Sequence, residues 1–362
     1  MNIDSNHESK KFQSVEVGWQ WPSGGSTRGA REQTCLRDLG GDWLPAWLRP
    51  GTLAASRARS QGIGATKLSW LRPRISPRRF ARIIFASLAG LFLLLIGLLH
   101  LAGFLFSLHD RSMKAYPSKV VTDSFGHTVR SYELTATNAE WNIIFVHGTP
   151  ATAAVFGEQF RYPFPRANLI ALDRPGFGAS GPARRWPSLD DQVNVLAELL
   201  PTNANPRTIL VGHSYGGPVA LLAALKLTNQ VAGVVLIGGS IDPAQEHVLT
   251  IQKIADWPVV SWLLPSALRN CNRELITLRA DLARMQPRIA TLTVPVVMLH
   301  GEQDRQVPVA NVAYLRAQLA AANKTNLFAA LVFPNYNHFI PWEHPDAVEA
   351  ALRMVTNAIS AR

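Results

Sequence analysis

The chain has few cysteines for its length. Its 362 residues include only Cys35 and Cys271. Two cysteines are too few for a disulfide framework, and they exclude a cysteine-based metal site, which needs several ligands at short spacing. No segment resembles a metal or nucleotide motif either. We therefore expect no metal and no cofactor, and we expect Cys271 to act as a small apolar packing residue.

Charge is absent from residues 83–108, which contain no Asp, Glu, Lys or Arg and in which His100 is the most polar residue. At about 1.5 Å per residue, a helix of this length exceeds the roughly 30 Å hydrocarbon thickness of a bilayer. The run is far longer than the apolar region of a cleaved signal peptide, which is the competing interpretation, and some 80 residues precede it. A buried core helix is a third interpretation, which an uncharged run of this length disfavours. The sequence predicts an uncleaved transmembrane anchor at 83–108, with the lipid bilayer as its partner.

Acidic residues are scarce before this run. Residues 1–82 contain 14 of the 36 Lys and Arg residues but 6 of the 25 Asp and Glu residues. The positive-inside rule then predicts a cytoplasmic N-terminus and a main domain on the far side, periplasmic or extracellular. Residues 1–82 show no sustained helical or strand period, which indicates a basic, disordered tail. No recognised binding module accompanies that tail, so no nucleic acid partner is expected.

Residues 113–362 alternate between short apolar runs and helical segments, which predicts one domain. Most of the apolar runs lack the alternation of a half-exposed strand, so the pattern indicates a mostly parallel sheet with helices on both faces, an α/β fold. The first two runs flank a predicted hairpin turn. Strands are expected at 120–122, 128–134, 142–146, 168–172, 208–211, 233–237, 294–299 and 328–333, and helices at 189–200, 218–227, 309–321 and 345–359.

The sequence Gly-His-Ser-Tyr-Gly-Gly at 212–217 directly follows one of these runs. A strand that ends in Gly-x-Ser-x-Gly and leads into a helix is typical of a nucleophile elbow, in which the strained turn exposes the Ser214 hydroxyl. The alternative is a strand-to-helix loop with an incidental serine. A nucleophilic serine needs a base and a third group that orients the base. Asp304 and His338 each follow a later strand, at the edge where such groups gather.

Five segments together resemble the α/β-hydrolase fold superfamily, in its serine hydrolase or esterase-like branch, over residues 118–358. The resemblance implies that Ser214 is the nucleophile, His338 the general base and then acid, and Asp304 the partner of the imidazole. It also implies an oxyanion hole formed by the backbone N–H groups of Thr149 and Tyr215. The family usually has a glycine before the histidine, where this chain has an asparagine. The matching segments are His147-Gly148-Thr149-Pro150, Asp173-Arg174-Pro175-Gly176-Phe177-Gly178-Ala179-Ser180, the elbow, His300-Gly301 with Asp304 and Val307-Pro308, and the stretch around His338.

Other residues compete for some of these roles. Asp242 occupies an acid position that some relatives use, and His344 is the rival base. Asp173 is expected to fix the loop that follows its strand by hydrogen bonds, with Arg174 as a candidate partner. His147 and His213 are interpreted as structural.

Residues 240–293 break the alternation at the place where family members insert a cap over the active site. Trp257, Trp262 and Leu263 are predicted to line an apolar substrate pocket. Two alternatives remain open: these side chains pack the cap onto the domain, or they touch the bilayer.

The sequence thus predicts a membrane-anchored serine hydrolase that cleaves a carboxylic ester, or a thioester or amide, of a small acyl substrate through an acyl-enzyme. An aminopeptidase or acyltransferase using the same three residues is one alternative, and a non-catalytic, membrane-tethered binding protein is another. The elbow lacks the nucleophilic aspartate of dehalogenases and epoxide hydrolases, which argues against those reactions. The acyl chain, the leaving group and the oligomeric state do not follow from the sequence.

Overall fold

The computed structural model describes residues 76–109, 112–122, 126, 128–181, 188–201 and 205–362. Cys35 and nearly all of the predicted disordered tail, up to residue 75, lie outside the described residues.

The first described element is helix α1, Pro77–His109, which is 33 residues long. It begins six residues before the apolar run predicted at 83–108, because Pro77 supplies a preset first turn behind Ser76, whose carbonyl accepts the N–H groups of Arg79 and Phe80. The stretch Pro77–Ala102 is long and apolar enough to cross a membrane, and none of it is buried within the structure. Length and composition are therefore those of a membrane span.

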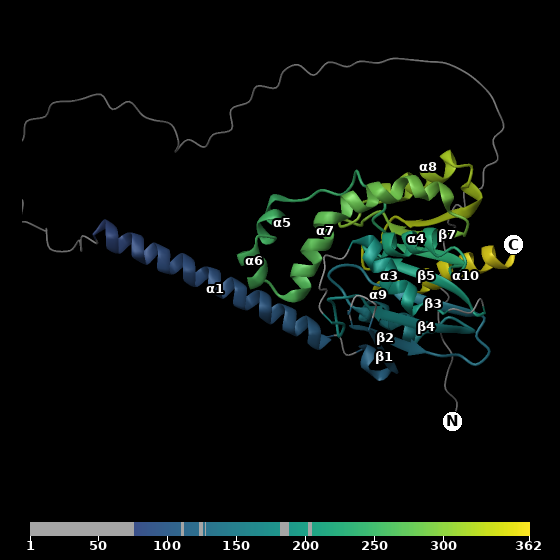
Figure 1. The fold of residues 1–362 in the computed structure, drawn as a ribbon, viewed down its shortest axis with the longest axis horizontal. Coiled ribbons are helices and arrows are strands. Elements are labelled where there is room, and N and C mark those ends of the chain that lie inside the picture. The colour runs from purple at the N-terminus through teal and green to yellow at the C-terminus, as the bar shows by residue number, and fades with distance from the viewer. Residues whose placement is uncertain (1–75, 110–111, 123–125, 127, 182–187, 202–204) are drawn as a thin grey trace, which may run out of the picture. The chain divides into compact units, whose positions relative to one another are not determined.

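An eight-stranded sheet forms the centre of the fold (Figure 1). Its order is β1-β2-β4-β3-β5-β6-β7-β8, and all pairs from β4 to β8 are parallel, while β1–β2 and β2–β4 are antiparallel. This is the mostly parallel sheet that the apolar runs predicted, and the α/β-hydrolase arrangement that the resemblance implied. The strands are β1 Ser118–Thr122, β2 Thr128–Leu134, β3 Trp141–Val146, β4 Ala167–Asp173, β5 Arg207–His213, β6 Gly233–Ile237, β7 Val296–Gly301 and β8 Phe328–Phe333.

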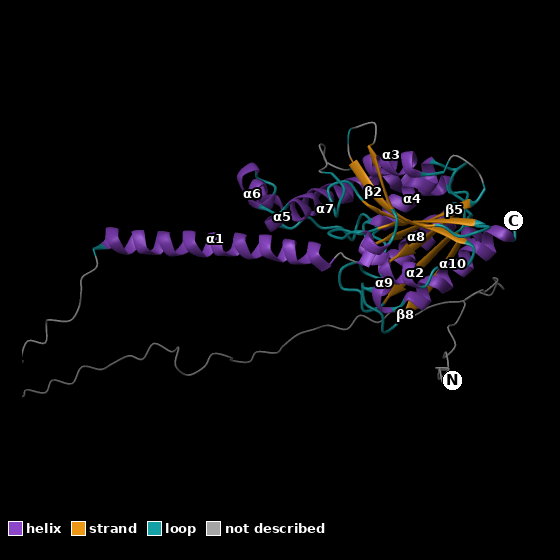
Figure 2. Cartoon of the chain, turned by 90° about the horizontal axis from the view of Figure 1, so that it is seen from below, coloured by secondary structure: helices purple, strands orange, loops and turns teal. Residues whose placement is uncertain are grey.

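Helices cover both faces of the sheet, as Figure 2 shows edge-on. One buried cluster joins the sheet to α3, α4 and α8, and a second joins its other face to α2 and α10. The strands β3 and β6 are buried along their whole length, and β5 is buried at every residue except Arg207, which explains why their apolar runs lack the alternation of a half-exposed strand. The helices after α1 are α2 Gly157–Arg161, α3 Leu189–Leu199, α4 Gly216–Lys226, α5 Thr250–Ala255, α6 Pro258–Leu263, α7 Ser266–Met285, α8 Ala310–Ala321, α9 Ile340–Glu343 and α10 Pro345–Ser360, with short 3₁₀ turns at Ser112–Ala115, Ala153–Phe156, Gln286–Thr291 and Thr325–Leu327.

Helix α3 shows how closely local sequence determines an element here. Its N-cap Ser188 accepts the N–H of Asp191, whose carboxylate in turn accepts the Ser188 N–H, forming a capping box. The predicted start at 189 is therefore confirmed. The helices α5, α6 and α7 occupy the break between β6 and β7, where the cap was expected.

Candidate active site

Ser214 lies in the sharp turn between β5 and α4, with a φ of +54°. A non-glycine residue rarely adopts this left-handed conformation, which stores strain and is concentrated at functional sites. The neighbouring glycines leave the turn no room for side chains. A Cβ on Gly212 would lie 2.2 Å from the Gly216 carbonyl oxygen, and one on Gly216 would lie 2.1 Å from that of Val146. The elbow therefore depends on glycine at both positions.

Asp304 and His338 are joined directly. The imidazole Nδ1 of His338 donates to Asp304 Oδ2 at 2.7 Å, and Asp304 Oδ1 accepts the backbone N–H groups of Gln306 at 2.9 Å and Val307 at 2.8 Å. Burial by itself would raise the pKa of Asp304, but its bond to His338 and these backbone donors lower it below the ordinary value. The carboxylate is thus kept ionised where it can orient the imidazole.

The loop after β6 brings this pair to the elbow. The Ser214 N–H donates to the Ile237 carbonyl at 2.9 Å. The next residue, Gly238, has a φ of +51°, and a Cβ there would lie 3.1 Å from Asp304 Oδ2 and 3.3 Å from His338 Nδ1. From the other side, His213 Nε2 donates to the His338 carbonyl at 3.0 Å. Ser214, Asp304 and His338 therefore gather at the carboxyl ends of β5, β7 and β8.

The loop after β3 lies against the nucleophile, since a Cβ on Gly148 would lie 2.7 Å from Ser214 Cβ. Thr149 follows in this loop, and Tyr215 is the N-cap residue of α4, with a side chain that is buried. The Thr149 hydroxyl is buried, close to the side chains of Cys271 and Glu274 of α7. The two predicted oxyanion donors thus lie on the two backbone segments that flank Ser214.

The rival acid and the rival base lie elsewhere. The Asp242 carboxylate accepts the N–H of Ala244, and the Asp242 N–H donates to Asn311 Oδ1. The His344 ring stacks on Tyr336 with centroids 3.5 Å apart, at the start of α10. In the described part of the chain, neither side chain forms a hydrogen bond with Asp304 or His338.

The histidines interpreted as structural are buried next to the site. Burial, reinforced by the nearby His338, lowers the pKa of His213 to about 3. Burial and the charge of Arg174 lower the pKa of His147 well below its ordinary value. The neutral His147 donates from Nδ1 to the Gly148 carbonyl at 2.7 Å and accepts the Arg174 N–H at Nε2, at 2.9 Å. It links the loops after β3 and β4.

Asp173 fixes the loop after β4 as expected. Its carboxylate accepts the N–H groups of Ala153 and Ala179, each at 2.8 Å. Gly178 closes the same loop with a φ of +53°, and a Cβ there would collide with the Asp173 carboxylate.

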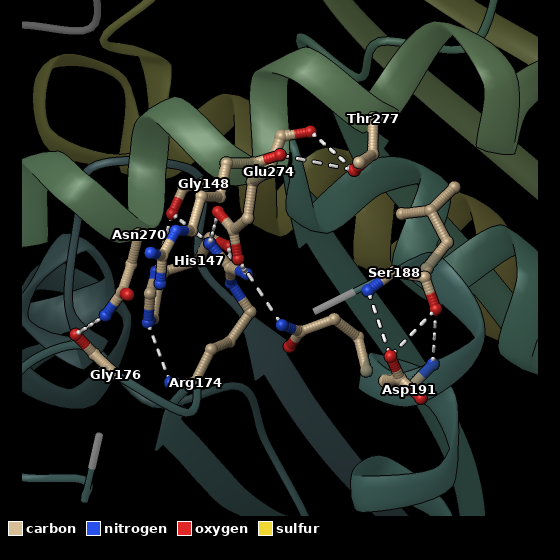
Figure 3. Close-up of polar contacts among 12 residues, drawn as sticks. His147, Gly148, Arg174, Gly176, Ser188, Asp191, Asn270, Glu274 and Thr277 are labelled. Carbon is tan, nitrogen blue, oxygen red and sulfur yellow. Dashed lines mark hydrogen bonds and ion pairs between the residues drawn. The ribbon is translucent and has the colours of Figure 1, made fainter. Parts of the chain in front are cut away.

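Arg174 has a partner that the sequence did not indicate. Its guanidinium forms a buried ion pair with Glu274 of α7, one hundred residues further along the chain (Figure 3). In the same helix, Asn270 Nδ2 donates to the Gly176 carbonyl at 2.9 Å. The sequence predicts this stretch only as part of the cap at residues 240–293. The signal that indicates Glu274 is a carboxylate on the inner, apolar stripe of an amphipathic helix.

Two of the three cap residues predicted to line a pocket are largely exposed. Trp257 is 62% exposed and Trp262 is 76% exposed, while Leu263 is half-buried. The two tryptophans therefore do not pack the cap onto the domain, and they do not line an enclosed cavity in this structure.

Among the residues that the structure describes, no group of three or more His, Cys, Asp or Glu side chains is placed to hold a metal ion. Cys271 is buried and unpaired, and burial raises the pKa of its thiol to about 11.

Comparison with known proteins identifies the family. The model of the alpha/beta hydrolase family matches residues 143–351, more than half of the chain, and the chain belongs to this family. Curated relatives include 2-(acetamidomethylene)succinate hydrolase of Mesorhizobium japonicum, 26% identical over 60% of this chain and 88% of its own length. They also include pimeloyl-[acyl-carrier protein] methyl ester esterase of Nitrosomonas europaea, 24% identical over 54% of this chain and 88% of its own.

Solved structures share the fold. A membrane phospholipase A described as a bacterial virulence factor aligns with a TM-score of 0.53 and 19% identity, over 79% of this chain and all of that one. The structure of E-2-(acetamidomethylene)succinate hydrolase aligns with a TM-score of 0.51 and 20% identity, over 67% of this chain and 99% of that one. The fold and the relatives make this chain an alpha/beta hydrolase.

Proposed function

We propose that the protein is a membrane-anchored serine hydrolase that cleaves a carboxylic ester through an acyl-enzyme. The observation that carries this proposal is the hydrogen-bonded Asp304–His338 pair at the sheet edge where Ser214 is held at positive φ. A base oriented by an ionised carboxylate is what a serine hydroxyl requires to become a nucleophile at neutral pH.

In the proposed reaction, His338 Nε2 takes the hydroxyl proton as Ser214 Oγ attacks the substrate carbonyl carbon. The oxyanion accepts the N–H groups of Thr149 and Tyr215. The imidazolium then gives its proton to the leaving alcohol oxygen as the ester C–O bond breaks. Water, deprotonated by His338, attacks the acyl-enzyme carbonyl. The bond between the acyl carbon and Ser214 Oγ then breaks, and the His338 imidazolium returns the proton to Oγ, which releases the carboxylic acid and regenerates Ser214. Asp304 stays ionised throughout and holds the Nδ1 proton.

Esters are the preferred class because one relative is a methyl ester esterase and one structural neighbour is a phospholipase. Thioesters and amides would pass through the same steps. An aminopeptidase or acyltransferase would use the same three residues with a different leaving group or acceptor. A binding protein without catalysis would not need the Asp304–His338 bond or the strained serine.

Membrane attachment is part of the proposal, with α1 as the span. The helices α5 and α6, here called the outer cap helices, support membrane attachment because large apolar side chains on or next to them are exposed. Val259 is 73% exposed, and Trp257 and Trp262 are exposed beside it. His100, the polar residue of the apolar run, lies with Nε2 2.9 Å from the Leu263 carbonyl of α6. Tryptophan is typical of the membrane interface, where its ring is buried and its N–H stays hydrated. We place α5 and α6 at that interface.

The test uses the full-length chain in detergent or nanodiscs, as wild type and as Ser214→Ala. Both are treated with a fluorescent fluorophosphonate and with p-nitrophenyl esters of short and long acyl chains. Labelling and turnover that vanish in the variant are expected. A folded wild-type protein that neither labels nor turns over would overturn the proposal and favour the binding protein.

Topology is tested separately with reporters fused after Arg362. We propose that the N-terminus is cytoplasmic and that the main domain lies on the far side of the membrane. A reporter that works only outside the cytoplasm is then expected to be active. Activity of a cytoplasmic reporter at the same position would contradict it.

A further inference from the structure

We propose that Arg174 and Glu274 are positioning residues whose buried ion pair couples cap helix α7 to the oxyanion hole. The inference rests on the proposed serine hydrolase function. It names residues outside the predicted catalytic set, and it predicts that the cap governs catalysis through this pair as well as through substrate access.

Arg174 holds the oxyanion loop by its backbone. Its Nε donates to the His147 carbonyl at 2.9 Å and its Nη2 to the Gly148 carbonyl at 2.8 Å. The Arg174 N–H adds a third bond, to the His147 ring. The peptide units held this way directly precede Thr149, whose N–H is a predicted oxyanion donor. Their orientation therefore determines the direction in which that donor points.

The same guanidinium also touches the other side of the predicted hole. Its central carbon lies 4.7 Å from the centroid of the Tyr215 ring and 4.9 Å from that of Phe177. A cation over an aromatic face is attracted by it, more strongly where water is excluded. Tyr215 carries the second predicted donor. One side chain thus contacts both segments that would bind the oxyanion.

Glu274 completes the arrangement from the cap, as Figure 3 shows. Its two carboxylate oxygens pair with Nη1 and Nη2 of Arg174, and Gln192 of α3 donates to the carboxylate at 3.3 Å. Both members of the pair are fully buried. A planar guanidinium can serve a carboxylate and two carbonyls at once, which a lysine cannot. The geometry ties the position of α7 to the shape of the loop.

A buried ion pair of this kind is a poor way to gain stability, because desolvation of two charges offsets their attraction. An apolar pair of similar volume would suit a purely structural contact at least as well. A charged pair has a use here that an apolar pair lacks, because the Arg174 guanidinium also donates hydrogen bonds to the two carbonyls of the oxyanion loop.

The experiment compares Glu274→Gln and Arg174→Lys with Asp281→Asn in the full-length protein. Asp281 is the matched control. It is also a buried carboxylate on α7, two turns further along, but it accepts the Leu189 N–H of α3 and does not contact the oxyanion loop. Steady-state kinetics, the fluorophosphonate labelling rate, the melting temperature and hydrogen exchange of the 147–152 amides are measured for each.

We expect Glu274→Gln and Arg174→Lys to lower kcat by about 10²-fold with little change in KM, because a misplaced donor acts on the transition state. Exchange of the 147–152 amides is expected to accelerate in both. Asp281→Asn is expected to lower the melting temperature while keeping kcat within about threefold of wild type. Unchanged kcat and exchange in Glu274→Gln, or an equal loss of kcat in Asp281→Asn, would overturn the proposal.

Two further measurements separate the remaining outcomes. If the single variants do not fold, Arg174→Met with Glu274→Leu gives an apolar pair that is expected to fold and to remain slow; wild-type kcat in that double variant would refute the positioning role. If the wild type shows no turnover dependent on Ser214, the proposed function fails, and the hydrogen exchange comparison alone decides the coupling.

Discussion

The edge of the sheet that carries the proposed active site and the outer cap helices α5 and α6 differ in how much protein their side chains contact. At the edge, almost every candidate residue is fixed by backbone contacts: Gly212 and Gly216 have no space for a methyl group, and Asp304 accepts three hydrogen bonds. In α5 and α6 the large side chains contact little protein, and Trp262 is 76% exposed. The residues of the first region are those that hold a particular geometry. The residues of the second region suit the lipid surroundings that we propose for them. The inner cap helix α7 belongs with the first, because Glu274 and Asn270 bind the loops around the site.

The largest expected effect is at the edge. Asp304→Asn preserves the size of the side chain but removes the negative charge that orients the His338 ring and stabilises its imidazolium form. We expect kcat to fall by about 10⁴-fold, which corresponds to about 5.5 kcal/mol. The matched Asp242→Asn variant removes the rival acid and is expected to keep its activity. Comparable losses in both variants would show that the acid has been assigned to the wrong residue.

Glycine offers a second way to sharpen the comparison. Gly216→Ala places a methyl group 2.1 Å from a backbone oxygen, so the elbow must distort, and we expect a loss of about 3 kcal/mol or more in the free energy of unfolding. The control is Gly97→Ala in α1, where nothing lies within 4 Å and alanine is the better helix former. Chemical denaturation of both variants, with fluorophosphonate labelling, measures the difference. A tolerated Gly216→Ala would mean that the turn is looser than described.

Acid should weaken the edge through its buried histidines. His213 is neutral in the folded protein, with a pKa of about 3, whereas in the unfolded chain it has the ordinary value of 6.5. The unfolded state therefore binds more protons between these values, and stability is lost as pH falls through that window, by about 1.4 kcal/mol per pH unit for this residue. His213→Gln should show a shallower decline of the unfolding free energy from pH 6.5 to 5. An unchanged slope would show that His213 becomes protonated in the folded state.

The contrast between the regions also explains what the sequence could predict. Continuous apolar runs predicted the buried strands, and a helix was predicted to begin at 189, where Ser188 and Asp191 form the capping box of α3. Such signals depend on neighbours within a few residues. The meeting of Ser214, Asp304 and His338 could be predicted because each follows a parallel strand, and parallel strands bring their carboxyl ends to one edge of the sheet.

The rest depends on contacts that no local pattern contains. The pairing of Arg174 with Glu274 spans one hundred residues, and nothing near Arg174 in the chain indicates it. The pocket predicted from Trp257, Trp262 and Leu263 was inferred from residue type and from their place in the predicted cap. A large apolar side chain fits a pocket, a packing contact or a bilayer equally well, and only its exposure distinguishes them.

The smallest expected effect on folding is in the outer cap. Trp262→Ser removes a side chain that contacts little protein, so we expect the free energy of unfolding to change by less than about 0.5 kcal/mol. The proposed interface is then tested with Val259→Cys, labelled with an environment-sensitive dye in nanodiscs that contain brominated lipid; Ser360→Cys, exposed at the end of α10, is the control. Because bromine quenches only at short range, quenching at 259 and none at 360 is expected. Equal quenching at both positions, or none at either, would place α5 and α6 away from the bilayer.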